Sequence, residues 1–225
     1  MIRWEQPGYV VAFTTRRGGV SDGVYASLNL TSGTGDDTAR VEENRRIACA
    51  ELGFEHERLS FNRQVHSTIV HRAGSRGVEG DGLWSEEPGV PMLALGADCL
   101  PIAVARTDGG RALAVLHAGW RGLADGLVAA GVAALGDGPK AAVVGPAIGP
   151  CCYEVGEEVA TLFDEDLTAD RRLDLWSAAE RALRRAGVDR VERVDLCTRC
   201  HPELFFSHRR DGRARGAQGV IGALA

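Results

Sequence analysis

The chain has 225 residues, of which 44% are hydrophobic and 25% are charged, so it can bury a sizeable core without stabilising cross-links. Its formal net charge of -5 and its isoelectric point of about 5.7 exclude the broad positive field that nucleic-acid binding usually requires. We therefore expect a small-molecule substrate and no nucleic-acid partner.

The sequence contains no apolar run near the roughly 20 residues that cross a membrane, and its start lacks the basic and apolar regions of a signal peptide. We expect a cytoplasmic protein with no membrane partner. In that compartment, the six cysteines are expected to be thiols or metal ligands rather than disulfides.

Predicted strands and helices alternate along the chain, which indicates an α/β or α+β protein with buried central strands. The acids Asp36 and Asp37 are expected to cap the first helix. In chain order, the pattern predicts a strand near Val10–Thr15, a helix at Asp37–Leu52, strands near Phe61–His71 and Met92–Ala105, a strand at Ala112–His117, a helix at Leu123–Leu135, a short strand at Ala141–Val144, and helices at Gly156–Phe163 and Leu173–Ala186.

Three residues that can bind a metal lie near predicted strand ends, namely His66, Cys99 and His117. Neighbouring strands of one sheet could bring them together, and a His/Cys/His set leaves one position of a tetrahedral zinc open for a water molecule. Spacing alone leaves two alternatives. In the first, His66 and His117 are ordinary hydrogen-bonded histidines and Cys99 is a buried apolar residue. In the second, Cys99 is a nucleophile and His117 is its base, as in a metal-free hydrolase.

Arginines beside glycine-rich turns are candidates for an anion site, because a guanidinium group binds phosphate through paired hydrogen bonds. Most of them are expected to be solvated surface residues, and the RRGG stretch lacks the Lys-Ser/Thr element of a P-loop. The five arginines in such positions are Arg16, Arg17, Arg121, Arg209 and Arg210.

The stretch from Cys197 to His201, CTRCH, fits the C-x-x-C-H pattern of c-type haem attachment. A cytoplasmic setting disfavours haem, and the adjacent residues Cys151 and Cys152 have the wrong spacing to complete a four-ligand zinc site. We therefore expect the adjacent pair to pack in a turn and the CTRCH stretch to be structural.

Seven motifs follow one another from about Thr14 to Ala225: TTRRGGVSDGVYASLNL, ENRR, QVHS, ADCLP, LHAGWRG, GPAIGPCCYEVGEEV and FFSHRRDG. In this order they closely resemble the laccase-domain family, once called multicopper polyphenol oxidoreductases and now regarded as purine nucleoside phosphorylases with adenosine deaminase activity. The resemblance implies an α+β fold with one domain over 1–225. That domain would be an α/β/β/α layered sandwich, similar to the catalytic domain of cytotoxic necrotizing factors.

The resemblance also implies a zinc ion bound by His66 of QVH, Cys99 of ADC and His117 of HAGWRG, with copper possible at the same site. The implied reactions are phosphorolysis of adenosine, inosine, guanosine and methylthioadenosine to base and pentose 1-phosphate, and hydrolytic deamination of adenosine to inosine. Phosphorolysis requires a clamp for the phosphate, for which Arg16 and Arg121 are candidates.

Two positions depart from the family pattern: Ser67 in QVHS, and the turn Gly80-Asp81-Gly82, where the role of Asp81 is open. The alternatives to a phosphorylase are a copper-dependent polyphenol oxidase, a Cys-His hydrolase, and a non-catalytic module that binds purines or metals. Six histidines and one cluster of candidate ligands are too few for a multicopper oxidase, so the older family name suits this chain poorly.

Overall fold

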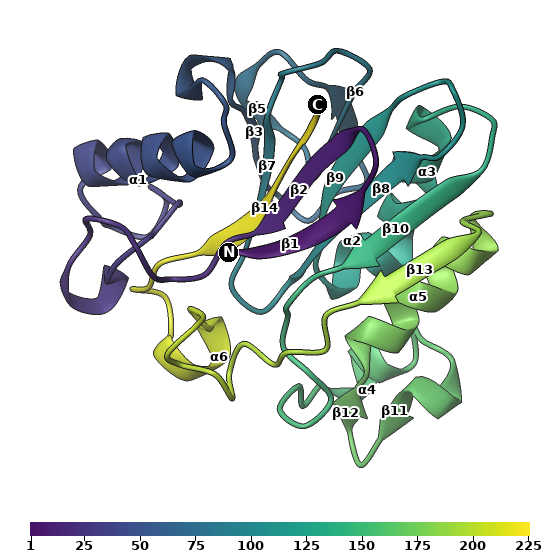
Figure 1. The fold of residues 1–225 in the computed structure, drawn as a ribbon. Coiled ribbons are helices and arrows are strands. Elements are labelled where there is room, and N and C mark those ends of the chain that lie inside the picture. Colours follow the sequence, from purple (N-terminus) through teal and green to yellow (C-terminus); the bar gives the residue numbers. More distant parts are fainter.

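The computed structural model describes residues 1–225 and contains two six-stranded sheets that pack face to face (Figure 1). In spatial order, the first sheet consists of β1 (Ile2–Gln6), β2 (Tyr9–Phe13), β14 (Gln218–Leu224), β7 (Met92–Gly96), β3 (Ser60–Arg63) and β5 (Arg76–Glu79). The second sheet consists of β13 (Arg190–Arg193), β10 (Lys140–Val144), β8 (Leu100–Arg106), β9 (Leu113–Ala118), β6 (Gly82–Ser85) and β4 (Val70–Arg72).

Helices cover the outer faces of both sheets (Figure 1). Helix α1 (Thr38–Glu51) packs on the first sheet, whereas α2 (Trp120–Asp125), α3 (Leu127–Ala134) and α5 (Leu175–Arg185) pack on the second. The layers therefore follow the order α/β/β/α, which confirms the predicted fold class. The remaining short elements, in the connections, are α4 (Glu157–Ala160), α6 (His208–Asp211), β11 (Thr168–Ala169) and β12 (Arg172–Leu173).

The side chains of β8 alternate between two hydrophobic cores, one on each face of the second sheet. Ile102 and Val104 pack toward the helices, whereas Ala103 and Ala105 pack toward the other sheet. Successive side chains of a strand point to opposite faces, so a strand that is covered on both faces is apolar throughout. This accounts for the nearly continuous apolar run in the sequence.

Two predicted strands are each divided in the structure, and both divisions bear on function. The run Met92–Ala105 was predicted as one strand but forms β7 in the first sheet and β8 in the second. The chain turns at Asp98, whose φ of 92° lies in the left-handed region, and it turns so tightly that a Cβ on Gly96 would lie 2.7 Å from the Cys99 carbonyl oxygen. The predicted strand Phe61–His71 likewise separates into β3 and β4, in different sheets.

Local signals also explain where the helices begin and end. The predicted helix Leu123–Leu135 is divided into α2 and α3 at Gly126, whose φ of 98° ends the first helix in a left-handed conformation. The Asp37 side chain caps α1 by accepting a hydrogen bond from the backbone N–H of Ala39, as predicted. Asp36 does not cap this helix and accepts from Ser21 Oγ and Asn29 Nδ2 instead.

None of the helices combines the length and the apolar character that a membrane span requires. The extent of the single domain over 1–225 and the likeness to cytotoxic necrotizing factors stay predictions. Two of the three connections from the first sheet to the second matter for function, because they carry the candidate ligands His66 and Cys99.

Candidate active site

The three candidate ligands come together at one edge of the paired sheets. His66 lies in the connection from β3 to β4, Cys99 in the turn from β7 to β8, and His117 near the end of β9. The Cys99 Sγ atom is 3.7 Å from His66 Nε2, the two imidazole rings have centroids 4.9 Å apart, and one potential ligand atom from each residue lies within 4.8 Å of the other two. The structure thus brings together residues that are far apart in the sequence.

A buried carboxylate, that of Asp81, holds two of these residues in place. Asp81 Oδ1 accepts hydrogen bonds from His117 Nδ1 at 2.8 Å and from the backbone N–H of His66 at 3.0 Å. Asp81 Oδ2 accepts from the backbone N–H groups of Val65 and Ser67 and from Ser67 Oγ. The connection around His66, whose φ of 61° is unusual for a residue other than glycine, is therefore wrapped around one carboxylate.

This carboxylate also determines which nitrogen of His117 is available. A hydrogen bond from Nδ1–H to Asp81 leaves Nε2 as the atom that can face Cys99 and His66. Ligand histidines in metal sites usually make this kind of hydrogen bond, because it fixes the orientation of the ring and increases its basicity.

Charge is strongly coupled within the cluster. Burial raises the pKa of the Cys99 thiol, but His117 and His66 outweigh burial and lower that pKa from 9.0 to about 6. Burial lowers the pKa of His117, but Cys99 and Asp81 outweigh burial and raise it from 6.5 to about 9. The pKa of Asp81 lies well below its usual range because hydrogen bonds from His117 and Ser67 outweigh its burial. Cys99 and His117 therefore each stabilise the charged form of the other.

A second buried carboxylate, Asp98, fixes the turn that carries Cys99. Its side chain accepts hydrogen bonds from Thr198 Oγ1 and from the backbone N–H of Arg209, both at 2.7 Å. The backbone N–H of Ile148 donates to its carbonyl oxygen at 2.9 Å. The position of Cys99 therefore depends on two segments that follow much later in the chain.

The cluster opens into a cavity of about 830 Å³. His117 is buried, Cys99 is half-buried and His66 is exposed, so solvent reaches the group from the His66 side. The backbone of Gly119 approaches closely, and a Cβ at this position would lie 2.5 Å from His66 Cδ2 and 3.3 Å from Cys99 Sγ. The cavity is large enough for a ligand of nucleoside size.

Three arginines in the cavity wall form no ion pair with any carboxylate: Arg121, Arg209 and Arg215. Arg121 stacks on the Trp120 ring and Arg209 on the Tyr153 ring. Arg215 is half-buried, its Nε atom is buried without a partner, and burial lowers its pKa. These guanidinium groups are available to an anionic ligand.

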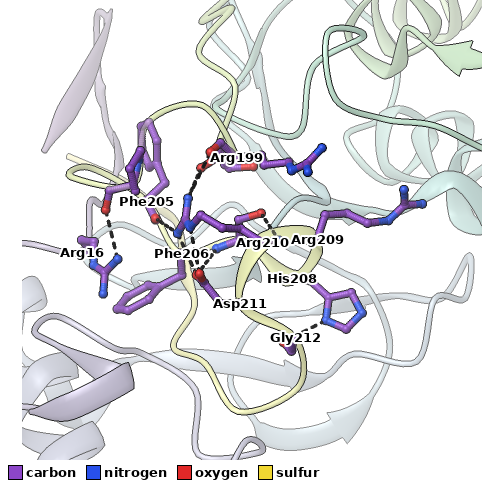
Figure 2. A network of polar contacts seen from close by, with 12 residues as sticks. Arg16, Arg199, Phe205, Phe206, His208, Arg209, Arg210, Asp211 and Gly212 are labelled. Atoms are coloured by element: carbon purple, nitrogen blue, oxygen red, sulfur yellow. Dashed lines mark hydrogen bonds and ion pairs between the residues drawn. The ribbon is translucent and has the colours of Figure 1, made fainter.

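The two arginines that the sequence analysis proposed for phosphate have different surroundings. Arg121 lines the cavity, whereas Arg16 does not. The Arg16 side chain donates to the carbonyl oxygens of Ala26 and Pro202 and lies over the Phe206 ring, beside which it is seen in Figure 2. Arg16 thus joins the N-terminal loop to the C-terminal segment.

Sequence reasoning left out Asp81 and Arg215. The turn containing Asp81 was noted as unusual, but only the fold shows that its carboxylate reaches His117. Arg215 stands beside no recognisable motif, and no signal in the sequence separates it from surface arginines. The prediction that the two cysteine segments are unrelated is wrong, because the sulfur atoms of Cys151, Cys152, Cys197 and Cys200 lie within 4.8 Å of one another.

Known proteins resemble this chain over almost its full length. The family model described as multi-copper polyphenol oxidoreductase laccase matches residues 10–224. Purine nucleoside phosphorylase PA4543 of Pseudomonas aeruginosa is 39% identical, covering 93% of this chain and 92% of its own, and purine nucleoside phosphorylase YfiH of Escherichia coli is 36% identical with the same coverage. The crystal structure of YlmD from Geobacillus stearothermophilus superimposes with a TM-score of 0.87 at 33% identity, covering 97% of this chain and 93% of that one.

Alkylation of Cys99 tests the electrostatics of the cluster. In metal-free protein, its reaction with iodoacetamide is expected to increase with pH through a midpoint near 6, because the thiolate is the reacting form. Cys49 is the internal control, since burial raises its pKa from 9.0 to about 11 and keeps it unreactive over this range. Peptide mass spectrometry measures both. A midpoint near the ordinary thiol value of about 8.5 would contradict the described coupling between Cys99 and the two imidazoles.

Proposed function

We propose that this chain, which belongs to the multi-copper polyphenol oxidoreductase laccase family, is a zinc-dependent purine nucleoside phosphorylase. The observation that carries the proposal is the presence, around one cavity, of the His66/Cys99/His117 cluster and the arginines without carboxylate partners. The names of the Pseudomonas and Escherichia relatives support it.

The donor set fits zinc. Two imidazole nitrogens and one thiolate are ligands that zinc prefers, and three protein ligands leave a fourth position open. The lowered pKa of Cys99 favours the thiolate that zinc binds, and the hydrogen bond from His117 Nδ1–H to Asp81 leaves Nε2 as the nitrogen that can bind the metal. When bound, zinc would lower the pKa of a water molecule and polarise substrate oxygens.

The residues of the chain would bind and orient both substrates. In phosphorolysis, a phosphate oxygen forms a bond to C1′ of the ribose while the C1′–N9 bond breaks and the purine leaves with a proton. Arg121, Arg209 and Arg215 would hold the phosphate, because charge-assisted hydrogen bonds from guanidinium groups are strong and directional. The aromatic rings of Trp120 and Tyr153 in the cavity wall would pack against the nucleoside.

We also propose hydrolytic deamination of adenosine at the same centre, in which water adds at C6 and ammonia leaves. The proposed nucleosides for phosphorolysis are adenosine, inosine, guanosine and methylthioadenosine. The cavity volume of about 830 Å³ is compatible with all four, so a single site would serve both reactions.

Copper is the alternative metal, because a set of two histidines and one cysteine also occurs in single-copper sites. Against a multicopper oxidase, the structure contains only two clusters of potential metal ligands, and the second consists of cysteines alone. A metal-free Cys-His hydrolase is the other rival, and the coupled pair of Cys99 and His117 would suit it.

The direct test compares wild type with Cys99→Ala. Wild type is expected to release hypoxanthine from inosine only when phosphate is present, and the variant is expected to lose this activity by roughly 100-fold or more because the ligand set is incomplete. Chromatography of base and pentose 1-phosphate measures the reaction. Cys49→Ala is the matched control, since it removes a thiol from the core under α1 and leaves the cavity unchanged.

Metal dependence separates the rivals in the same assay. A phosphorylase loses activity when a chelator strips the metal and regains it with zinc, whereas a Cys-His hydrolase keeps its activity without metal. Full turnover by Cys99→Ala would refute the site. Phenol oxidation with copper, without any nucleoside turnover, would establish the oxidase instead.

Arg215→Gln tests the phosphate clamp. A hydrogen bond to a charged group contributes about 1.5–3 kcal/mol, so the variant is expected to raise the KM for phosphate roughly 10- to 150-fold. Arg213→Gln is the control, because Arg213 is exposed and lies outside the cavity wall. Initial rates at varied phosphate concentration measure both variants. Equal values of KM in both would show that Arg215 does not bind phosphate.

A further inference from the structure

Four cysteines that the proposed reaction does not use form a second cluster. Cys151 and Cys152 lie in the turn after β10, and Cys197 and Cys200 lie in the loop after β13. The Cys200 Sγ atom is 3.7 Å from that of Cys151 and 3.4 Å from that of Cys152, and all four sulfur atoms lie within 4.8 Å of one another. The fold therefore gathers two pairs of thiols at one place.

The spacing of the sulfur atoms fits a tetrahedral metal. A Zn–S bond length of about 2.3 Å places the ligands of a four-thiolate zinc about 3.8 Å apart, close to the two distances from Cys200. A disulfide requires about 2.05 Å between two sulfur atoms, and all six cysteines are free thiols in this structure.

The backbone around Cys197 is arranged to stabilise a thiolate. The N–H of Gly149 donates to Cys197 Sγ at 3.3 Å, and the N–H of Cys200 donates to the Cys197 carbonyl oxygen at 3.2 Å, which fixes the loop around this sulfur. Cys197 is buried, whereas Cys151 and Cys200 are exposed, so one ligand is anchored in the protein and a metal can enter from solvent.

We propose that Cys151, Cys152, Cys197 and Cys200 bind one structural zinc ion. Four protein thiolates fill the coordination sphere, so this zinc has no open position for substrate or water. Thiolate ligands favour zinc over the harder cations magnesium and calcium, and their number makes this site chemically different from the one at Cys99.

The proposed zinc ties together the segments that position the active site. Residue 197 pairs with Ala147 in a parallel bridge, and the following residue, Thr198, donates to the Asp98 carboxylate beside Cys99. The Arg210 guanidinium donates to the carbonyl oxygens of Thr198 and Arg199. Figure 2 shows Arg210 beside Arg199. Tyr153, the residue after Cys152, lines the cavity.

Metal analysis of reduced, purified protein tests the proposal, with two variants that remove different sites. Wild type is expected to contain one equivalent of zinc more than the double variant Cys151→Ser/Cys200→Ser. Cys99→Ala, the matched control, is expected to keep the zinc of the cysteine cluster. X-ray absorption at the zinc edge of Cys99→Ala should then show four sulfur neighbours at about 2.3 Å and no nitrogen.

The absorption measurement is made on Cys99→Ala, so it tests the proposal even if the double variant does not fold. Zinc-free Cys99→Ala protein would overturn the proposal. So would a mass decrease that shows a disulfide between the two cysteine segments in protein that carries no zinc at them. Because the readout is metal content and coordination, the result is independent of nucleoside turnover.

Discussion

The Asp81 carboxylate holds the candidate active site together. It is almost completely buried, and a buried carboxylate without partners costs several kcal/mol. Asp81 instead accepts five hydrogen bonds, all from the connection around His66 and from the His117 ring. One carboxylate thus holds the connection in which His66 has a left-handed φ, and it also orients the imidazole ring of His117 in β9. Loss of this carboxylate would leave three backbone donors of the connection and the Nδ1–H of His117 without their partner.

The two sheets explain why such a site forms at this edge. The chain passes from the first sheet to the second three times: through the connection that carries His66, through the short connection from β5 to β6 that carries Asp81, and through the turn that carries Cys99. Asp81, which lies on the second of these connections, holds the one that carries His66, and Asp98 holds the turn that carries Cys99. Because Thr198 and Arg209 donate hydrogen bonds to Asp98, the C-terminal segment also helps to fix the turn that carries Cys99. The proposed second zinc would be bound at the start of that segment, by Cys197 and Cys200. The two centres would then be mechanically linked without sharing a ligand.

The extent to which the sequence predicts this site differs among its parts. The α/β/β/α layers were predicted only through the family resemblance, whereas the strand ends in the sequence already suggested that His66, Cys99 and His117 could meet. The division of Met92–Ala105 at Asp98 was not, since a residue other than glycine adopts a left-handed φ only under tertiary constraint. The roles of Asp81 and Arg215, and the meeting of Cys152 with Cys200, depend on contacts between distant segments. Spacing within one segment carries no information about such contacts.

We propose that His66, Cys99 and His117 bind a zinc ion and that Asp81 holds these ligands in place. Anomalous diffraction from crystals of the purified protein, recorded on both sides of the zinc absorption edge, tests it most directly. The account predicts a zinc peak about 2.0–2.3 Å from the two histidine nitrogens and the Cys99 sulfur, with the His117 Nδ1 atom still bonded to Asp81. Crystals of protein that turns over inosine but shows no metal peak between these three residues would contradict it.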